Sequence, residues 1–204
     1  MKAGRRPTLI GVSGVDGSGK SSLVRSLVQH YRGAGDDPGR LYLYGCLVCR
    51  RWGRRSLSSA SGNEHGVSRR AMSLIQSLHA HLDAGEMSAR LAVAVLPNLW
   101  RQGPRLIITD RSPLDGLVKH DPPPSSLVAR WYVGIAQRYS TLLWLDGEAA
   151  TLAARDGEHT EQQLAAAQNG FRKWSTRLPN VVRIDTTGTP LSEITRRVFS
   201  AGVS

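Results

Sequence analysis

The residues best suited to chemistry lie in one short stretch near the N-terminus, Gly14–Ser21, which has the sequence GVDGSGKS. It fits the pattern G-x-x-x-x-G-K-[ST], in which glycines let successive backbone N–H groups turn inward around phosphate oxygens. The lysine of this pattern reaches the β- and γ-phosphates of a nucleotide, and the next hydroxyl binds Mg²⁺. We therefore predict that Lys20 binds phosphate and that Ser21 is a magnesium ligand. The other predicted phosphate-binding residues are Gly14, Asp16, Gly17, Ser18, Gly19 and Ser22.

This motif works only when a strand precedes it and a helix follows it. Thr8–Val15 is an apolar, β-branched run that predicts a buried strand. Lys20–Tyr31 has leucines and valines at helical spacing and ends before a glycine-rich turn. We therefore expect the loop to join a buried strand to the N-terminus of a helix, where the helix dipole also favours phosphate.

The rest of the chain alternates between expected strands and helices. Further strands are predicted at Leu41–Val48, Arg105–Asp110, Thr141–Leu145 and Val181–Asp185. Helices are predicted at Ser68–Leu82, Glu86–Arg101 (interrupted at Pro97), Ser125–Arg138, Glu148–Arg155, Thr160–Thr176 and Pro190–Phe199. Such alternation predicts an α/β fold with a parallel sheet that is covered by helices on both faces.

Length and composition indicate one globular domain. The chain has 204 residues and 40% hydrophobic residues, which suits a single domain over 1–204 and excludes wholesale disorder. Within it we expect a disordered tail at 1–7 and a mobile loop at 50–68. No apolar run is long enough to span a bilayer, no apolar stretch follows the basic start, and two cysteines cannot form a disulfide framework. We expect a cytoplasmic protein with no membrane partner.

The net charge of +11 indicates an anionic partner. More than half of it falls between Arg40 and Arg70, where seven arginines accompany one acid, Glu64. A nucleic-acid surface more often spreads its basic residues between aromatic stacking platforms, and here only Trp52 is interleaved. The distribution favours a local site for a small anion and makes nucleic acid a minor alternative.

Other residues that could carry chemistry have simpler interpretations. Cys46 and Cys49 form one C-x-x-C without a second pair, which is typical of structural thiols. His79 and His81 lack partners at metal-ligand spacing. The Asn/Thr-Lys-x-Asp segment that selects guanine is absent, and the chain has little room for the elements of a motor ATPase. Among the classes of protein that carry this phosphate-binding motif, a small kinase is the interpretation that remains.

Two segments resemble the thymidylate kinase family. Gly14–Ser22 (GVDGSGKSS) resembles the phosphate loop of that family, and Leu106–Ser112 (LIITDRS) is similar to its strand ending in Asp-Arg-Tyr and to the acidic-Arg-Ser segment of deoxynucleoside kinases. Leu142–Asp146, Phe171 and Pro179–Asp185 are similar to the C-terminal half. The resemblance implies a three-layer P-loop kinase fold with a five-stranded parallel sheet in the order 2-3-1-4-5.

The resemblance also implies roles for individual residues. It makes Lys20, Asp16, Asp110 and Arg111 the catalytic set, with ATP as phosphoryl donor and Mg²⁺ as cofactor. Asp16 would contact a sugar hydroxyl of the acceptor, Asp110 would hold Mg²⁺ through water, and Arg111 would bind the acceptor phosphate. Further acceptor-binding residues would be Arg50, Arg51 and Arg90, and Arg155 would serve the ATP side from a short lid at 155–161. Relatives of this family are commonly homodimers.

The sequence departs from the family where the acceptor is chosen. The family's Arg-Glu-Pro segment is replaced by Cys49–Arg55, Asp-Arg-Tyr has become Asp-Arg-Ser, and the lid is acidic. We expect transfer of the γ-phosphoryl group to a nucleoside monophosphate, thymidylate-like, or to a related small phosphate. One alternative is a kinase of the same fold that phosphorylates a hydroxyl of a nucleoside or specialised metabolite, with Asp16 as base. The other is a nucleotide- or RNA-binding protein without turnover.

Overall fold

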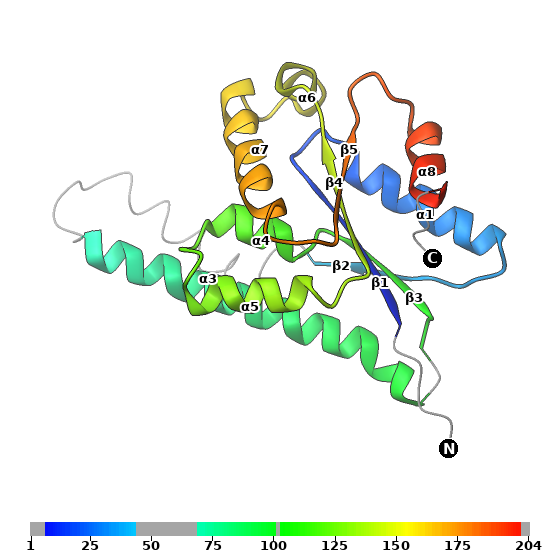
Figure 1. Cartoon of the computed structure of the whole chain (residues 1–204), viewed down its shortest axis with the longest axis horizontal. Coiled ribbons are helices and arrows are strands. Elements are labelled where there is room, and N and C mark those ends of the chain that lie inside the picture. The colour runs from blue at the N-terminus through cyan, green and yellow to red at the C-terminus, as the bar shows by residue number, and fades with distance from the viewer. Residues whose placement is uncertain (1–6, 44–68, 101–102, 201–204) are drawn as a thin grey trace.

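The computed structural model describes residues 7–43, 69–100 and 103–200, with the side chains at 69–73, 99–100 and 199–200 left undescribed. Five parallel strands form one sheet in the order β2-β3-β1-β4-β5 (Figure 1). The predicted fold class and strand order are therefore confirmed. The strands are β1 (Thr8–Gly14), β2 (Gly39–Tyr42), β3 (Leu106–Asp110), β4 (Thr141–Asp146) and β5 (Val181–Asp185).

The central strand β1 positions the predicted phosphate-binding loop. It pairs with β3 on one side and β4 on the other, and Ile10 and Val12 are fully buried because helices cover both faces of the sheet. The register sets Val12 opposite Asp110, and the backbone N–H of Arg111 donates to the Val12 carbonyl over 3.0 Å. The carboxyl ends of β1 and β3 therefore meet at one edge, where ligands bind in open parallel sheets.

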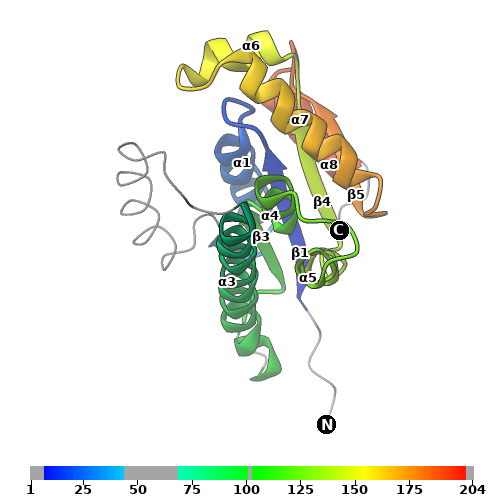
Figure 2. The same cartoon turned by 90° about the vertical axis from the view of Figure 1, so that its left-hand side faces the viewer.

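Helices cover both faces of the sheet (Figure 2). On one face α1 and α8 pack against each other over a core that includes Leu23, Leu27 and Val198. On the other face lie α3, α4, α5 and α7, around a second core that includes Leu117 and Tyr132. The helices are α1 (Lys20–Gly33), α3 (Arg69–Val95), α4 (Pro113–His120), α5 (Leu127–Ala136), α6 (Ala149–Asp156), α7 (Glu161–Ser175) and α8 (Leu191–Ser200).

The prediction of two helices between residues 68 and 101 was wrong. The structure has a single helix, α3, of 27 residues. Its buried positions Ala80, Ala84, Met87 and Leu91 keep helical spacing through the expected break, so packing against the core carries the helix past Gly85. The α-helix ends at Val95 and continues as a 3-10 turn, as expected from the following proline.

Helix α4 was missed. No element is predicted between the Asp-Arg segment and the helix at Ser125–Arg138, yet Pro113–His120 is helical. Its start carries a recognisable signal: the Ser112 side chain accepts from the Leu114 N–H, and the Asp115 carboxylate accepts from the Ser112 N–H. This capping box, with proline at the first helical position, explains why a helix starts directly after Arg111.

The remaining boundaries agree within two residues, except in the region of β2. That strand begins at Gly39, two residues earlier than expected, and 44–48 lie outside the described residues. The tail at 1–6, the expected loop at 50–68, and Cys46, Cys49 and Trp52 also lie outside them. No helix within the described ranges is both long and apolar enough to span a lipid bilayer.

Candidate active site

The loop between β1 and α1 has backbone conformations that favour glycine. Gly17 and Gly19 have φ values of 77° and 90°, in the left-handed region. A Cβ atom at Gly17 would lie 2.6 Å from the carbonyl oxygen of Leu152, whereas one at Gly19 would meet nothing within 4 Å. The loop therefore packs closely on α6 at one glycine and is open at the other.

Lys20 begins α1 and is folded over its own loop. Its Nζ donates to the Val15 carbonyl over 2.6 Å and lies 3.2 Å from Asp16 Oδ1. Burial, together with the nearby charge of Arg111, lowers the pKa of Lys20 below its ordinary value. The ammonium group therefore lies inside the loop, as the phosphate-binding motif requires.

Ser21 and Asp110 come from different elements and meet at the carboxyl edge of the sheet. Ser21 Oγ donates to Asp110 Oδ2 over 3.0 Å, and Arg40 Nη2 lies 3.5 Å from the same oxygen. Asp110 is buried at the end of β3. Hydroxyl and carboxylate oxygens are the ligands that Mg²⁺ prefers, directly or through water. The donor set thus fits the predicted magnesium site.

A cavity of about 390 Å³ lies over this loop. Its wall includes Gly17, Gly19 and Ser22 of the loop and, from across the site, Asp156 at the end of α6. Lys20, Ser21 and Asp110 face it as well. We call this space the donor cavity, because it lies over the loop whose sequence fits the pattern that binds the phosphates of a nucleoside triphosphate.

The side chains of Asp16 and Arg111 form an ion pair at the edge of the donor cavity. Arg111 Nη2 lies 2.6 Å from Asp16 Oδ1, while Arg111 Nη1 lies 3.2 Å from Asp115 Oδ1 and donates to the Gly14 carbonyl. Burial opposes ionisation of Asp16, but Arg111 and Lys20 outweigh it, so the pKa of Asp16 lies below its ordinary value. Burial likewise opposes the charge on Arg111, but the two carboxylates raise the pKa of Arg111.

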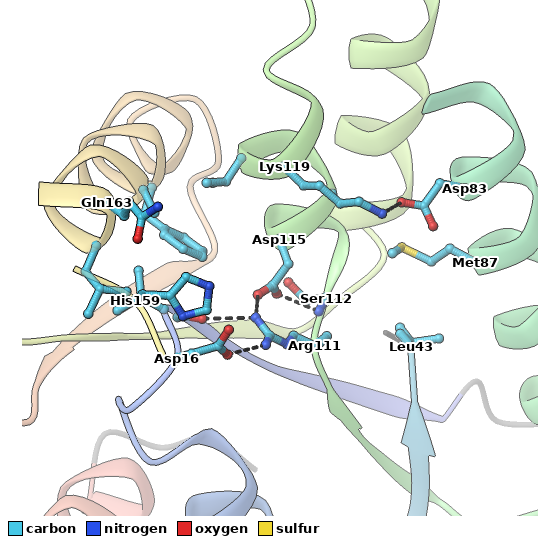
Figure 3. A pocket seen from close by; sticks show the side chains of 17 residues that line it. Asp16, Leu43, Asp83, Met87, Arg111, Ser112, Asp115, Lys119, His159 and Gln163 are labelled. Atoms are coloured by element: carbon cyan, nitrogen blue, oxygen red, sulfur yellow. Dashed lines mark hydrogen bonds and ion pairs between the residues drawn. The ribbon is translucent and has the colours of Figure 1, made fainter. Parts of the chain in front are cut away.

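A second cavity, of about 240 Å³, lies on the other side of this ion pair, among α3, α4 and α7 (Figure 3). Asp16 and Arg111 line this cavity as well as the donor cavity. Its far end carries Asp83 of α3, whose Oδ2 lies 3.1 Å from Lys119 Nζ and 2.8 Å from His120 Nε2. Met87 and Phe171 add apolar wall. We call it the acceptor cavity.

The charges that line the acceptor cavity neutralise one another. Among its described lining residues are three acids and two strong bases. Arg111 pairs with Asp16 and Asp115, and Lys119 pairs with Asp83. Burial opposes ionisation of Asp83, but the hydrogen bond with His120 and the charge of Lys119 hold the pKa of Asp83 below its ordinary value. The described part of the cavity therefore carries no excess of positive charge.

The predicted site residues do not all meet here. The loop residues, Asp110 and Arg111 come together as expected. Arg90 instead forms an ion pair with Glu86 and donates to the Tyr42 carbonyl over 3.2 Å, and it lines neither cavity. Arg155 is exposed near the end of α6 and also lines neither. Arg50 and Arg51 lie outside the described residues.

Sequence reasoning missed several residues of the acceptor cavity. Asp115 has a signal in the sequence, because it forms a capping box with Ser112. One helical turn after Arg111, it is also at the spacing of an ion pair. His159 follows Asp156 by three residues, a spacing that allows a local hydrogen bond between their side chains. The acidity of the lid alone did not indicate this pair. Nothing in the sequence pairs Asp83 with Lys119, which are 36 residues apart. That contact depends on the packing of α3 against α4.

Comparison with known proteins identifies the fold. No protein-family model and no curated protein sequence matches the chain. Among solved structures, a thymidylate kinase from Candida albicans, described as having broad substrate specificity, superposes with a TM-score of 0.64 at 16% sequence identity. The match covers 96% of this chain and 91% of that chain. The chain therefore has a thymidylate kinase-like fold, as the resemblance of its two motifs implied.

Proposed function

We propose that the protein is a Mg·ATP-dependent phosphotransferase that moves the γ-phosphoryl group of ATP to a small acceptor. One observation carries this proposal: the Asp16–Arg111 ion pair lines both the donor cavity over the phosphate loop and the acceptor cavity beyond it. Asp16 and Arg111 are the residues that the described linings of the two cavities have in common. Phosphoryl transfer depends mainly on such positioning and on neutralising charge.

In the proposed reaction, some residues of the site bind the phosphates and others stabilise the charge on the transferred group. The loop backbone and Lys20 bind the phosphates, and Ser21 with Asp110 would hold magnesium, which neutralises phosphate charge when bound. The guanidinium of Arg111 lies between the cavities, where negative charge develops on the transferred group. Asp16 keeps this guanidinium in position.

The first candidate acceptor is a nucleoside monophosphate of thymidylate type or a related small phosphate. The likeness of the fold to a thymidylate kinase supports it, and so does the guanidinium of Arg111, whose planar fork suits phosphate. This acceptor needs a cationic clamp, and Arg50 and Arg51 remain predicted members of it. Arg90 would have to leave Glu86 in order to join.

The second candidate acceptor is a hydroxyl compound, and the pairing of charges in the acceptor cavity favours it. Arg111 and Lys119 both form ion pairs with carboxylates. An entering phosphate dianion would be repelled by these three acids and would have to replace them as the partner of each cation. An uncharged hydroxyl compound enters without breaking these pairs. Both candidates share the same donor chemistry.

An acceptor screen with Mg·ATP tests the proposed function. Nucleoside monophosphates, nucleosides and small metabolites are supplied one at a time, and ADP release is followed. We expect release that depends on an acceptor, and Lys20→Ala should lower it by at least about 100-fold because it removes a charge that contacts the phosphates. Lys173→Ala is the matched control, since Lys173 pairs with Asp121 outside both cavities. Unchanged turnover in folded Lys20→Ala would contradict the proposal.

Two further expectations stay predictions. A nucleotide- or RNA-binding protein without turnover would show a strongly salt-dependent affinity for RNA or DNA and no acceptor-dependent ADP release. A homodimer is the expected assembly. The described surface that best suits one is the exposed apolar row on α3 formed by Leu74, Leu78 and Leu82, which share a helix face at a spacing of four.

A further inference from the structure

The loop between α6 and α7 carries a histidine–aspartate pair. His159 Nδ1 lies 2.6 Å from Asp156 Oδ2, and the His159 backbone N–H donates to the same oxygen over 3.0 Å. An ionised carboxylate only accepts hydrogen bonds, so the Nδ1 atom carries the hydrogen. The Nε2 atom of the neutral ring is then left as a proton acceptor, as in other histidines that a carboxylate orients.

This pair spans the two cavities. His159 lines the acceptor cavity, and Asp156 lines the donor cavity. Figure 3 shows the His159 ring next to Asp16, on the side of the cavity where Asp16 meets Arg111. The imidazole therefore lies beside the ion pair that lines both cavities.

Asp16, the base expected from sequence for a hydroxyl acceptor, is poorly suited to take a proton. Its carboxylate is bound by Arg111 and Lys20, which hold its pKa below the ordinary value. A general base works best with a pKa near the operating pH. Asp156 raises the pKa of His159 above its ordinary value, and the charges of Asp16 and Glu158 act in the same direction. Arg111 and Lys119, which line the same cavity, are the cations on its described wall.

A phosphorylated acceptor would not need a proton acceptor such as the His159–Asp156 pair. A phosphate oxygen is already ionised at neutral pH and needs no base, whereas a hydroxyl must lose a proton. The acceptor cavity has no unpaired cation among its described lining residues that would draw a phosphate in. The proton acceptor and the charge balance thus point to the same class of acceptor.

We propose that the acceptor is an unphosphorylated hydroxyl compound and that His159, oriented by Asp156, is the catalytic base that removes its proton. This inference rests on the proposed phosphotransferase function. The acceptor oxygen forms a bond to the γ-phosphorus of ATP while the bond from that phosphorus to the β,γ-bridging oxygen breaks. The hydroxyl proton goes to His159 Nε2, ADP leaves with the bridging oxygen, and the imidazolium returns its proton to solvent through its exposed edge. Atoms and charge balance without a further reactant.

The products of two matched sets of acceptors test this inference. Unphosphorylated nucleosides and hexoses are each supplied beside their own monophosphates with Mg·ATP, and the product is identified by phosphorus NMR. We expect a phosphomonoester from the unphosphorylated set. His159→Gln should lower kcat with that acceptor by about 10²- to 10⁴-fold, the usual contribution of a general base, and leave the KM for ATP unchanged. His79→Gln, on α3 and in neither cavity, is the control.

The pH dependence separates a base from a structural histidine. A base must be neutral, so kcat/KM should rise as pH increases through the pKa of His159. Asp156→Asn removes the main cause that raises this pKa and should move that rise to lower pH. His159→Gln should lose it.

Two results overturn the inference, and they are distinguishable. A phosphoanhydride product from the monophosphate set, with His159→Gln as active as wild type, overturns the acceptor class and the base while the proposed phosphotransferase stands. Transfer to no member of either set contradicts the proposed function itself, and the inference falls with it.

Discussion

The donor and acceptor cavities share one wall but are built in different ways. The donor cavity is mainly a single loop between β1 and α1, with Asp110 from the neighbouring strand. The acceptor cavity takes side chains from α3, α4, α7 and the loop before α7, which are far apart in the sequence. The proposed phosphate binding therefore depends on a local segment, through backbone N–H groups and a few glycines. The proposed choice of acceptor would depend instead on how four elements pack.

The largest effect should come from the residue that belongs to both cavities. Arg111→Ala removes the positive charge between them and should lower kcat/KM by about 10³-fold, the scale of a lost transition-state arginine. Arg111→Lys should recover only part of this, because one ammonium cannot bind Asp16 and Asp115 as a fork does. Steady-state kinetics with an active acceptor measure both. Arg172→Ala, on the exposed side of α7, is the control. An equal loss of kcat/KM in this variant would show that the effect does not depend on the position of Arg111 between the cavities.

On the donor side alone, two glycines of the loop make a matched pair. Gly17→Ala should weaken ATP binding more than Gly19→Ala, since only at Gly17 does a Cβ approach the Leu152 carbonyl oxygen, at 2.6 Å, in addition to the cost of a positive φ. We expect about 1–3 kcal/mol of extra loss at Gly17, which is about 5- to 150-fold in affinity. Calorimetric titration with a non-hydrolysable ATP analogue measures it. Equal affinities would show that contact with α6 does not shape the loop.

On the acceptor side, Asp83→Asn should change acceptor binding and stability but not the KM for ATP. The variant leaves Lys119 and His120 with a neutral partner, at a cost of about 1–3 kcal/mol in unfolding free energy at neutral pH. The pKa of Asp83 is lowered in the folded state, so its stabilisation is present above the ordinary value and is lost as pH falls through the lowered one. The two proteins should therefore converge in stability at acid pH. Denaturant unfolding as a function of pH tests this, and a gap that stays constant with pH would contradict it.

The smallest expected effects concern the packing of α4 on α5. A Cβ at Gly116, which lines the acceptor cavity, would overlap the buried ring of Tyr132, whereas one at Gly134 on α5 would meet nothing within 4 Å. Gly116→Ala should cost about 1–3 kcal/mol of stability. Gly134→Ala should add about 0.5–1 kcal/mol, because alanine loses less backbone entropy in a helix. Thermal unfolding of the two variants checks both signs; a stabilised Gly116→Ala would mean that this wall is loosely packed.

The same contrast explains what the sequence could reveal. The phosphate loop and the strand that ends at Asp110 were predictable because each depends on a contiguous pattern. The order of the strands followed from the resemblance that these patterns carry. Helix α4 was missed although its capping box is visible in the sequence, because Ser112 was considered only as part of the Asp-Arg segment.

The arginines expected around the acceptor show the limit of such reasoning. Arg90, expected to bind the acceptor because it lies twenty residues before Asp110, pairs instead with Glu86, one helical turn before it. The pairing of Asp83 with Lys119 arises only when α3 packs on α4, and His159 reaches Asp16 only when the loop before α7 meets the loop after β1. No local pattern specifies these contacts.

Transfer of label from γ-labelled ATP is the most direct test of the central claim, which is that the γ-phosphoryl group moves from the donor cavity to the acceptor cavity past Asp16 and Arg111. The protein is incubated with Mg²⁺, labelled ATP and the two sets of acceptors, and label is followed in small-molecule products. We predict that label appears in an acceptor product with the wild type and is lost with both Lys20→Ala and Arg111→Ala. Label that stays in ATP, or that appears only as inorganic phosphate whichever acceptor is present, would contradict it.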